Sequence, residues 1–165
     1  MSTMNTGEIS GTLTTLFAEL IDGAPKAFAY MLNTGDVGLL ASLDKLSASA
    51  ASETHGGGAS IAAHVDHLRY GLSLMNRWRE GEKNPFAGAD WTASWRRTKV
   101  SEEEWKRLRA ELRDQARRWR NALGTAWDVD AIELNGVVGS IAHLAYHMGA
   151  IRQIDRATRG PSAEE

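Results

Sequence analysis

The chain has 165 residues, no cysteine, five histidines, and 19 Lys and Arg against 21 Asp and Glu, which gives a formal net charge of −2. This length fits one domain, and the lack of cysteine excludes disulfide frameworks, thiolate zinc sites, Fe–S clusters and cysteine nucleophiles. The chain is not basic overall and polar residues interrupt every apolar stretch, so we expect no nucleic-acid partner and no membrane association.

Two helical segments are predicted in the first 55 residues, where apolar residues gather in Ile9–Ile21 and Val37–Leu46. They are separated by Gly23-Ala24-Pro25 and Asn33-Thr34-Gly35, and such residues end helices and favour turns. The N-terminus lacks the basic region that begins a signal peptide, so we expect a cytoplasmic protein.

A third helix is predicted from Ser60 to about Gly81, with Ser60 as its N-cap. Residues 81–100 follow and contain Trp91 and Trp95. Because most connections between helices are shorter, this segment is expected to be packed or functional. Its two tryptophans either roof a pocket or contact a partner chain.

Two long helices are predicted in the last part of the chain, over residues 102–126 and 130–158. Ser101 and Glu104 have the spacing of a capping box, and apolar residues then recur at three- and four-residue steps. The second helix is expected to end at Arg159-Gly160-Pro161, since glycine and proline commonly follow a helix.

Helices of about 20 residues with single apolar stripes pack well as an antiparallel bundle. Strand signals are weak, because long alternating runs of Val, Ile and Thr and Asn-Gly turns are missing from the sequence. We therefore predict a single all-α domain, built as an antiparallel four-helix bundle.

Four of the five histidines form two pairs at helical spacing, His64 with His67 and His143 with His147. Residues three or four apart lie on one face of a helix, so an HxxxH pair can bind one divalent ion. A third histidine from a facing helix would complete a site with an open position, as in catalytic metal sites. Spacing alone is also compatible with ordinary surface or core histidines. The fifth histidine, His55, lies in a glycine-rich loop and is not expected to bind metal.

Small residues accompany the histidine pairs. On a helical wheel His143 and His147 lie about 40° apart and flank the apolar stripe of their helix. Room beside the imidazoles is therefore expected, since the residues on this side are Gly136, Gly139, Ser140, Ala150 and, next to His67, Gly71.

The segment Ser60–Leu68 (SIAAHVDHL) is followed about 75 residues later by His143–Ile151 (HLAYHMGAI). This order of motifs resembles the DinB/YfiT-like superfamily over roughly residues 38–159. The resemblance implies a four-helix bundle with a metal held by one histidine of the second helix and an HxxxH pair of the fourth. Residues 1–37 would then be an N-terminal helical extension.

Carried onto this chain, the resemblance makes His143 and His147 the pair and His67, followed by Leu68, the ligand of the second helix. His64 also precedes an apolar residue and remains an alternative ligand or a neighbour of the site. The family often has glutamine in an HxGQI string, where this chain has Ala150.

Neutral histidine ligands suit Zn²⁺ or Ni²⁺ first, with Fe²⁺ as a third candidate. Such an ion can activate a bound water or a substrate thiolate, which predicts a metal-dependent hydrolase or a thiol S-transferase acting on a small-molecule substrate. The resemblance adds a low-molecular-weight thiol as cosubstrate. The alternative is a non-catalytic bundle that acts by binding or dimerising.

Few other polar residues are placed to assist a reaction at a metal bound by these histidines. Asp66 adjoins His67 but points about 100° away from it on the helix. Two tyrosines and two arginines could contact a substrate, although packing and surface roles are commoner for them: Tyr70, Tyr146, Arg69 and Arg152.

Ten of the 19 basic residues lie in residues 96–120. Trp105 and Trp119 in this segment fall on an apolar stripe, and Glu111 and Asp114 interrupt the charge, so a solvated helix face is the better interpretation. The aromatic connection over residues 81–100, together with the resemblance, predicts a homodimer.

Overall fold

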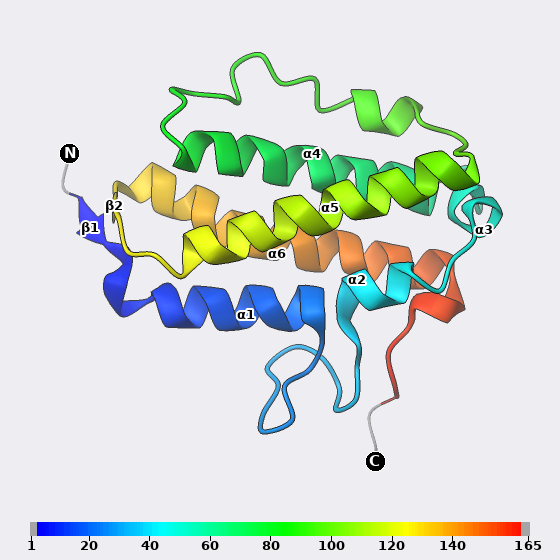
Figure 1. Ribbon diagram of the computed structural model, residues 1–165, viewed down its shortest axis with the longest axis horizontal. Coiled ribbons are helices and arrows are strands. Elements are labelled where there is room, and N and C mark those ends of the chain that lie inside the picture. Colours follow the sequence, from blue (N-terminus) through cyan, green and yellow to red (C-terminus); the bar gives the residue numbers. More distant parts are fainter. Residues whose placement is uncertain (1–2, 163–165) are drawn as a thin grey trace.

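The computed structural model describes residues 3–162, and in this range the chain is mostly helical, as predicted. Four long helices lie along the length of the molecule (Figure 1): α1 (Ser10–Asp22), α4 (Ile61–Arg79), α5 (Glu102–Leu123) and α6 (Ala131–Ile154). Shorter elements complete it: α2 (Gly38–Leu43), α3 (Ala48–Ser52), the antiparallel strands β1 (Met4–Asn5) and β2 (Asp128–Val129), and 3₁₀ turns at Thr6–Glu8, Ala93–Arg96 and Arg156–Thr158.

Side-chain caps explain where the long helices begin. The Ser60 hydroxyl accepts a hydrogen bond from the Ala63 N–H at the start of α4. Ser101 and Glu104 form the predicted capping box, in which each side chain accepts from the other residue's N–H. Asp130 and Glu133 form a second capping box at the start of α6. The predicted N-termini of all three helices are therefore confirmed.

The C-terminal ends of α5 and α6 come slightly earlier than predicted. Helix α5 ends at Leu123 and α6 at Ile154. Asp155 leaves the helical conformation, with φ −130° and ψ 124°, and its side chain caps the following 3₁₀ turn Arg156–Thr158. This local side-chain cap interrupts the helix before the expected Gly160-Pro161 stop.

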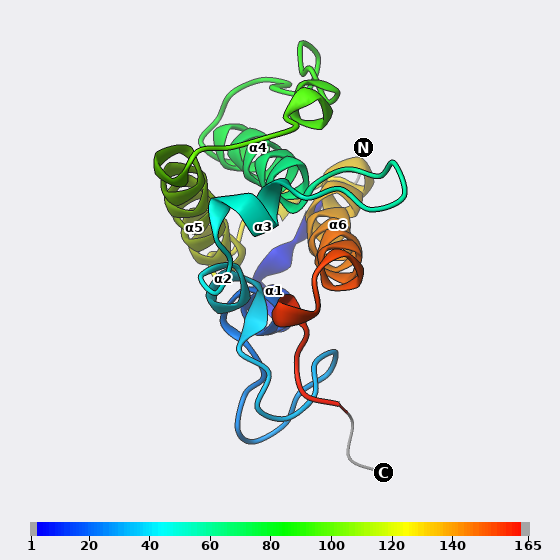
Figure 2. The ribbon, with the colours of Figure 1, turned by 90° about the vertical axis from the view of Figure 1, so that its right-hand side faces the viewer.

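The four long helices surround one apolar core. Each of them packs against two others, α4 and α1 each against α5 and α6, and Figure 2 shows α4 and α1 on opposite sides of this arrangement. Among the largest fully buried side chains are Phe17, Trp105 and Trp119. Both indole N–H groups are paired, that of Trp105 with the Leu46 carbonyl oxygen and that of Trp119 with the Ser140 hydroxyl. We call these four helices the helical core.

Helices α4 and α5 run parallel, which differs from the expected all-antiparallel bundle. Cross-helix contacts advance in the same direction along both helices: Arg69 with Glu111, Asn76 with Gln115 and Glu80 with Arg118. Residues 80–101 therefore carry the chain back along the molecule before α5 begins (Figure 1). The unusual length of this connection is the physical reason that two consecutive helices can run parallel.

The N-terminal region belongs to the helical core, so its assignment as an extension outside a bundle of residues 38–159 is wrong. Phe17, Leu20 and Ile21 of α1 are fully buried among core residues. The Glu19 carboxylate is also buried, and it accepts hydrogen bonds from the backbone N–H groups of residues 30–32. Burial raises the pKa of Glu19, but these three donors hold it below its ordinary value. The ionised carboxylate thus ties the loop after α1 to the core.

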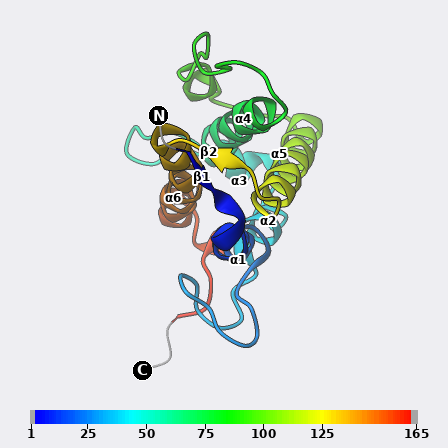
Figure 3. The same cartoon turned by 90° about the vertical axis from the view of Figure 1, so that its left-hand side faces the viewer.

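A small sheet, which the sequence pattern did not predict, joins the two distant parts of the chain. Met4 and Asn5 of β1 pair with Val129 and Asp128 of β2, at one end of the helical core (Figure 3). Strands of two residues are too short for a recognisable alternation of apolar and polar residues. Within residues 3–162, every helix is too short or too polar to cross a membrane.

The place of α1 in the core predicts a large loss of stability for Phe17→Ala. Phe17 is fully buried, so its removal leaves a cavity and should lower the free energy of unfolding by about 3–5 kcal/mol in urea denaturation. The matched control is Phe28→Ala, since Phe28 is 67% exposed, and it should change stability by less than about 0.5 kcal/mol. Equal effects of the two changes would contradict a core role for α1.

Candidate metal centre

The two histidine pairs meet across the contact between α4 and α6. His67 of α4 and His143 of α6 face each other with their Nε2 atoms 3.1 Å apart. The Nε2 atoms of His143 and His147 lie 2.9 Å apart. One ring nitrogen from each of these three residues lies within 4.8 Å of the other two. The structure therefore brings together the three histidines that the sequence singled out.

Three buried or half-buried imidazoles in this arrangement can hold one divalent ion. The Nε2 of His143 contacts ring nitrogens of both His67 and His147. A neutral imidazole nitrogen offers either one proton or one lone pair, so both contacts cannot be ordinary hydrogen bonds. Nitrogens bound to a tetrahedral zinc at about 2.1 Å lie about 3.4 Å apart. The observed spacing therefore fits a shared cation after small side-chain adjustments.

His64 lies on the outer side of this cluster. Its Nδ1 is 2.9 Å from the Nδ1 of His147, so it contacts the nitrogen that faces away from His143. A partner on the second nitrogen of a ligating histidine fixes the orientation of the ring. Of the two candidates on α4, the structure places His67 in the three-histidine cluster and His64 beside it.

Burial keeps the four imidazoles neutral. It lowers the pKa of His147 to about 3, with further contributions from His143, His64 and His67. Burial also lowers the pKa of His67, as do His143 and His64, and burial alone accounts for the lowered pKa values of His64 and His143. Because metals bind the neutral form of imidazole, the cluster is ready for an ion at neutral pH.

The Nδ1 of His67 is a buried nitrogen without a hydrogen bond of normal geometry in residues 3–162. The nearby Trp91 backbone partly offsets the lowering of the His67 pKa. A buried polar atom without a partner destabilises the fold and needs a reason to be retained. Placing the proton on Nδ1 leaves the Nε2 lone pair directed at His143, which is the tautomer a metal requires.

Trp91 and Trp95 cover the cluster from the connection between α4 and α5. The Trp95 ring stacks on His67 with 4.5 Å between ring centroids and contacts the His64 ring edge-on at 5.3 Å. Trp91 lies 5.8 Å from the His67 ring. Of the two roles expected for these tryptophans, the structure shows the first: they roof the histidines of their own chain.

Ion pairs attach the segment that carries these two tryptophans to α4. The buried Asp66 carboxylate accepts from Arg69 at 3.0 Å and from Arg97, just after the 3₁₀ turn, at 3.0 Å. Asp66 is therefore occupied in anchoring the connection and faces away from the cluster, as the helical geometry predicted. Arg69 is likewise paired with carboxylates and does not point into the site.

The remaining candidate polar residues have structural roles or are largely exposed to solvent. The Tyr70 hydroxyl accepts a hydrogen bond from the Asp90 N–H and so helps to hold the connection. Arg152 pairs with the buried Asp36 at 2.8 Å. Tyr146 is 72% exposed, and its ring contacts the His147 ring edge-on with 5.0 Å between ring centroids.

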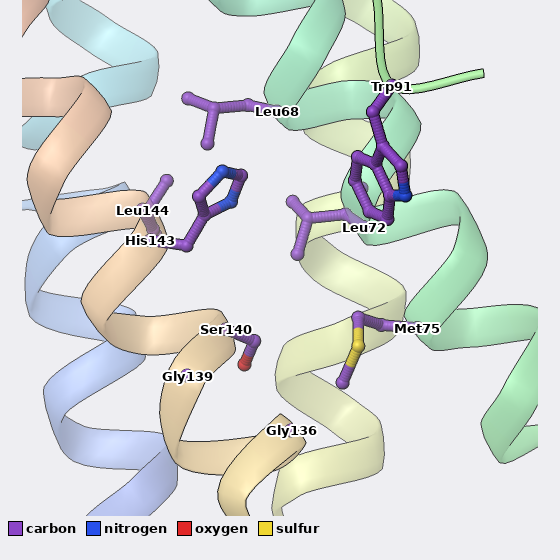
Figure 4. Close-up of a pocket in the computed structure, with 10 residues that line it drawn as sticks. Leu68, Leu72, Met75, Trp91, Gly136, Gly139, Ser140, His143 and Leu144 are labelled. Carbon is purple, nitrogen blue, oxygen red and sulfur yellow. The ribbon is translucent and has the colours of Figure 1, made fainter. Parts of the chain in front are cut away.

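An apolar cavity of about 270 Å³ opens beside His143 (Figure 4). It lies between α4 and α6, with Trp91 on the side of the connection. Leu68, Leu72 and Met75 of α4 face Gly136 and Gly139 of α6 across it. Of the small residues noted in the sequence, those that line this cavity are Gly71, Gly136, Gly139 and Ser140, whereas Ala150 does not. Leu72 and Met75 could be assigned to the cavity only from the structure.

The basic residues of α5 are largely paired with acidic residues of neighbouring elements. Arg109 and Arg113 both contact Asp44, at 2.8 and 2.7 Å. Arg120 contacts Asp22 at 2.6 Å. This arrangement fits the interpretation of the basic segment as a solvated helix face.

No family model matches the sequence, and neither a curated protein nor a solved structure matches it significantly. The histidine cluster and the cavity beside it therefore carry the functional interpretation.

The buried imidazoles predict that metal-free protein loses stability as the pH falls. The pKa of His147 is about 3 in the folded chain and 6.5 ordinarily. Between these values the unfolded chain binds more protons, so the free energy of unfolding should be highest above about pH 6.5 and decrease below it. The decrease should be on the order of 1 kcal/mol per pH unit from His147.

Urea unfolding at about pH 7.5 and 5.5 in the presence of a chelator measures this effect. His147→Gln should weaken the pH dependence, while His55→Gln, in an exposed loop, should leave it unchanged. An undiminished pH dependence in His147→Gln would contradict the buried neutral cluster.

Proposed function

We propose that this protein is a DinB-like metal-dependent enzyme in which His67, His143 and His147 hold one divalent ion. The observation that carries the proposal is the convergence of their ring nitrogens within 4.8 Å at the wall of an apolar cavity. His64 would hold the ring of His147 in its ligating orientation through the contact at Nδ1.

The position of the ligands in the helical core supports the DinB-type arrangement. Counting only the long helices, α4 is the second and α6 the fourth. The resemblance requires one histidine on the second helix and an HxxxH pair on the fourth, where His67, His143 and His147 stand. This correspondence uses α1 as the first helix of the bundle.

The ligand set favours Zn²⁺ or Ni²⁺, with Fe²⁺ third, because imidazole nitrogens suit these ions and the sequence contains no cysteine. Three protein ligands leave a coordination position for a water or a substrate atom. The ion would supply Lewis-acid activation at that position. Trp91 and Trp95 would limit the access of bulk water to it.

Thiol S-transfer is the better candidate of the two expected reactions. None of the residues that line the cavity beside His143 is acidic, so this wall supplies no carboxylate general base. A thiol has a pKa of about 8.5 and needs less help to lose its proton than water does. We therefore place a low-molecular-weight thiol and a small-molecule electrophile ahead of a hydrolysed substrate.

A non-catalytic bundle that acts by binding or dimerising is the second candidate. The exposed apolar side chains of Val138 and Tyr146 on α6 favour it. A homodimer is compatible with both candidates and stays a prediction. Metal content separates the two candidates, since only the enzyme needs the ion.

Metal analysis of the purified protein tests the proposed function. Wild-type protein should retain about one Zn²⁺ or Ni²⁺ per chain after gel filtration, and His67→Ala and His143→Ala should lose it because two nitrogens bind far more weakly than three. His64→Ala should keep the site but weaken affinity by about 10–100-fold, as loss of an orienting partner does.

His55→Ala is the matched control, since His55 is exposed outside the cluster, and it should retain full metal content. Unchanged metal content in both His67→Ala and His143→Ala would overturn the site. Wild-type protein that neither contains nor takes up stoichiometric metal would favour the non-catalytic candidate.

A further inference from the structure

The cavity beside His143 continues into a second hollow of about 450 Å³. The two share Met75 of α4 and Gly136 of α6, so they form one groove between these helices. Trp78, Phe86 and Ile132 line the far part. The combined volume is within the range of about 300–1,000 Å³ that small-molecule sites occupy.

The near part of the groove offers a ligand almost no hydrogen bonds. Its side chains with polar atoms are those of His143, Ser140 and Trp91, of which Trp91 offers only its indole N–H. The Ser140 hydroxyl donates to the Val137 carbonyl oxygen at 2.6 Å and accepts from the Trp119 indole at 2.9 Å. Its proton is therefore used within the fold. A charged or strongly polar group placed here would lose its hydration without compensation.

The glycines in the groove wall are not required by close packing. A Cβ atom built at Gly136 or Gly139 meets nothing within 4 Å. Glycine is unfavourable inside a helix, so a larger residue would be expected at both positions if the space had no use. Their lack of side chains keeps the groove open along α6.

Two polar residues are added in the far part of the groove. Asn84 and Glu133 line this part, whereas the histidine cluster lies at the other end. Gly136 and His143 are two helical turns apart, a distance of about 10 Å along α6. Trp91 and Phe86, from the connection between α4 and α5, cover the groove from outside, which suits an elongated small molecule better than a protein segment.

We propose that this groove binds a neutral, unbranched aliphatic chain of the substrate, with the reactive head group at the histidine cluster. The statement about the head group rests on the proposed function, whereas the binding of the chain rests on the groove alone. The Glu133 carboxylate in the far part of the groove disfavours a chain that ends in an anionic group.

Chain-length dependence of binding tests this assignment. Acetohydroxamate and octanohydroxamate share a metal-binding head and differ only in their alkyl chains, so Zn²⁺-loaded protein can be titrated with both by calorimetry. Burial of each additional methylene should strengthen binding about threefold to fourfold, and octanohydroxamate should bind at least about 100-fold more tightly. Equal affinities would overturn the proposal.

Two glycine variants locate the chain. Gly136→Leu fills the groove two turns from His143 and should reduce the advantage of octanohydroxamate to less than about tenfold without changing acetohydroxamate binding. Gly149→Leu adds the same side chain to α6 outside the groove, at another glycine whose Cβ would meet nothing within 4 Å, and should behave as wild type. Equal effects of both variants would contradict binding in the groove.

Metal-free protein separates this inference from the proposed function. Ligand-observed NMR with 1-octanol and ethanol needs no metal. Octanol, but not ethanol, should bind to wild-type and Gly149→Leu protein. Octanol binding should be lost in Gly136→Leu. Octanol binding without any metal uptake would sustain the groove and refute the metal centre. Absence of octanol binding to wild-type protein, or binding unaffected by Gly136→Leu, would refute the groove whatever the metal content.

Discussion

The antiparallel contact between α4 and α6 determines where all four clustered histidines lie. His64 and His67 are one turn apart on α4, and His143 and His147 are one turn apart on α6. Because the helices run in opposite directions, His67 meets His143 at 3.1 Å and His64 meets His147 at 2.9 Å. Neither helix alone supplies three nitrogens, so any shift of one helix along the other would separate the cluster.

The parallel course of α4 and α5 has a direct consequence for this site. Parallel neighbours need a connection that returns along the molecule, and residues 80–101 make that return over α4. The same segment carries Trp91 and Trp95, which cover the histidines, and it is held by Asp66 and Tyr70 of α4. The topology of the fold thus supplies the apolar cover that lowers the imidazole pKa values.

Much of this arrangement could be predicted from the sequence, because the decisive signals are local. Capping residues such as Ser60 and Ser101 mark the helix starts, and the spacing within each histidine pair places its members on one face. The motif order on which the proposed DinB-like assignment rests also singled out His67, His143 and His147, whose ring nitrogens the structure brings together.

The other features depend on tertiary contacts that no local pattern contains. The resemblance spans only residues 38–159 and so predicts residues 1–37 as an extension, yet α1 buries Phe17 in the core. His64 and His67 are both at the right spacing, and only the rotation of α4 against α6 distinguishes them. The direction of α5 likewise depends on how residues 80–101 pack.

The most direct test of the metal centre is a crystal structure of the protein loaded with Zn²⁺, with anomalous diffraction recorded at the zinc edge. We predict one anomalous peak about 2.1 Å from a ring nitrogen of each of His67, His143 and His147. His64 should contact the far nitrogen of His147 without binding the ion. A peak at other residues, or no peak between α4 and α6, would contradict the account.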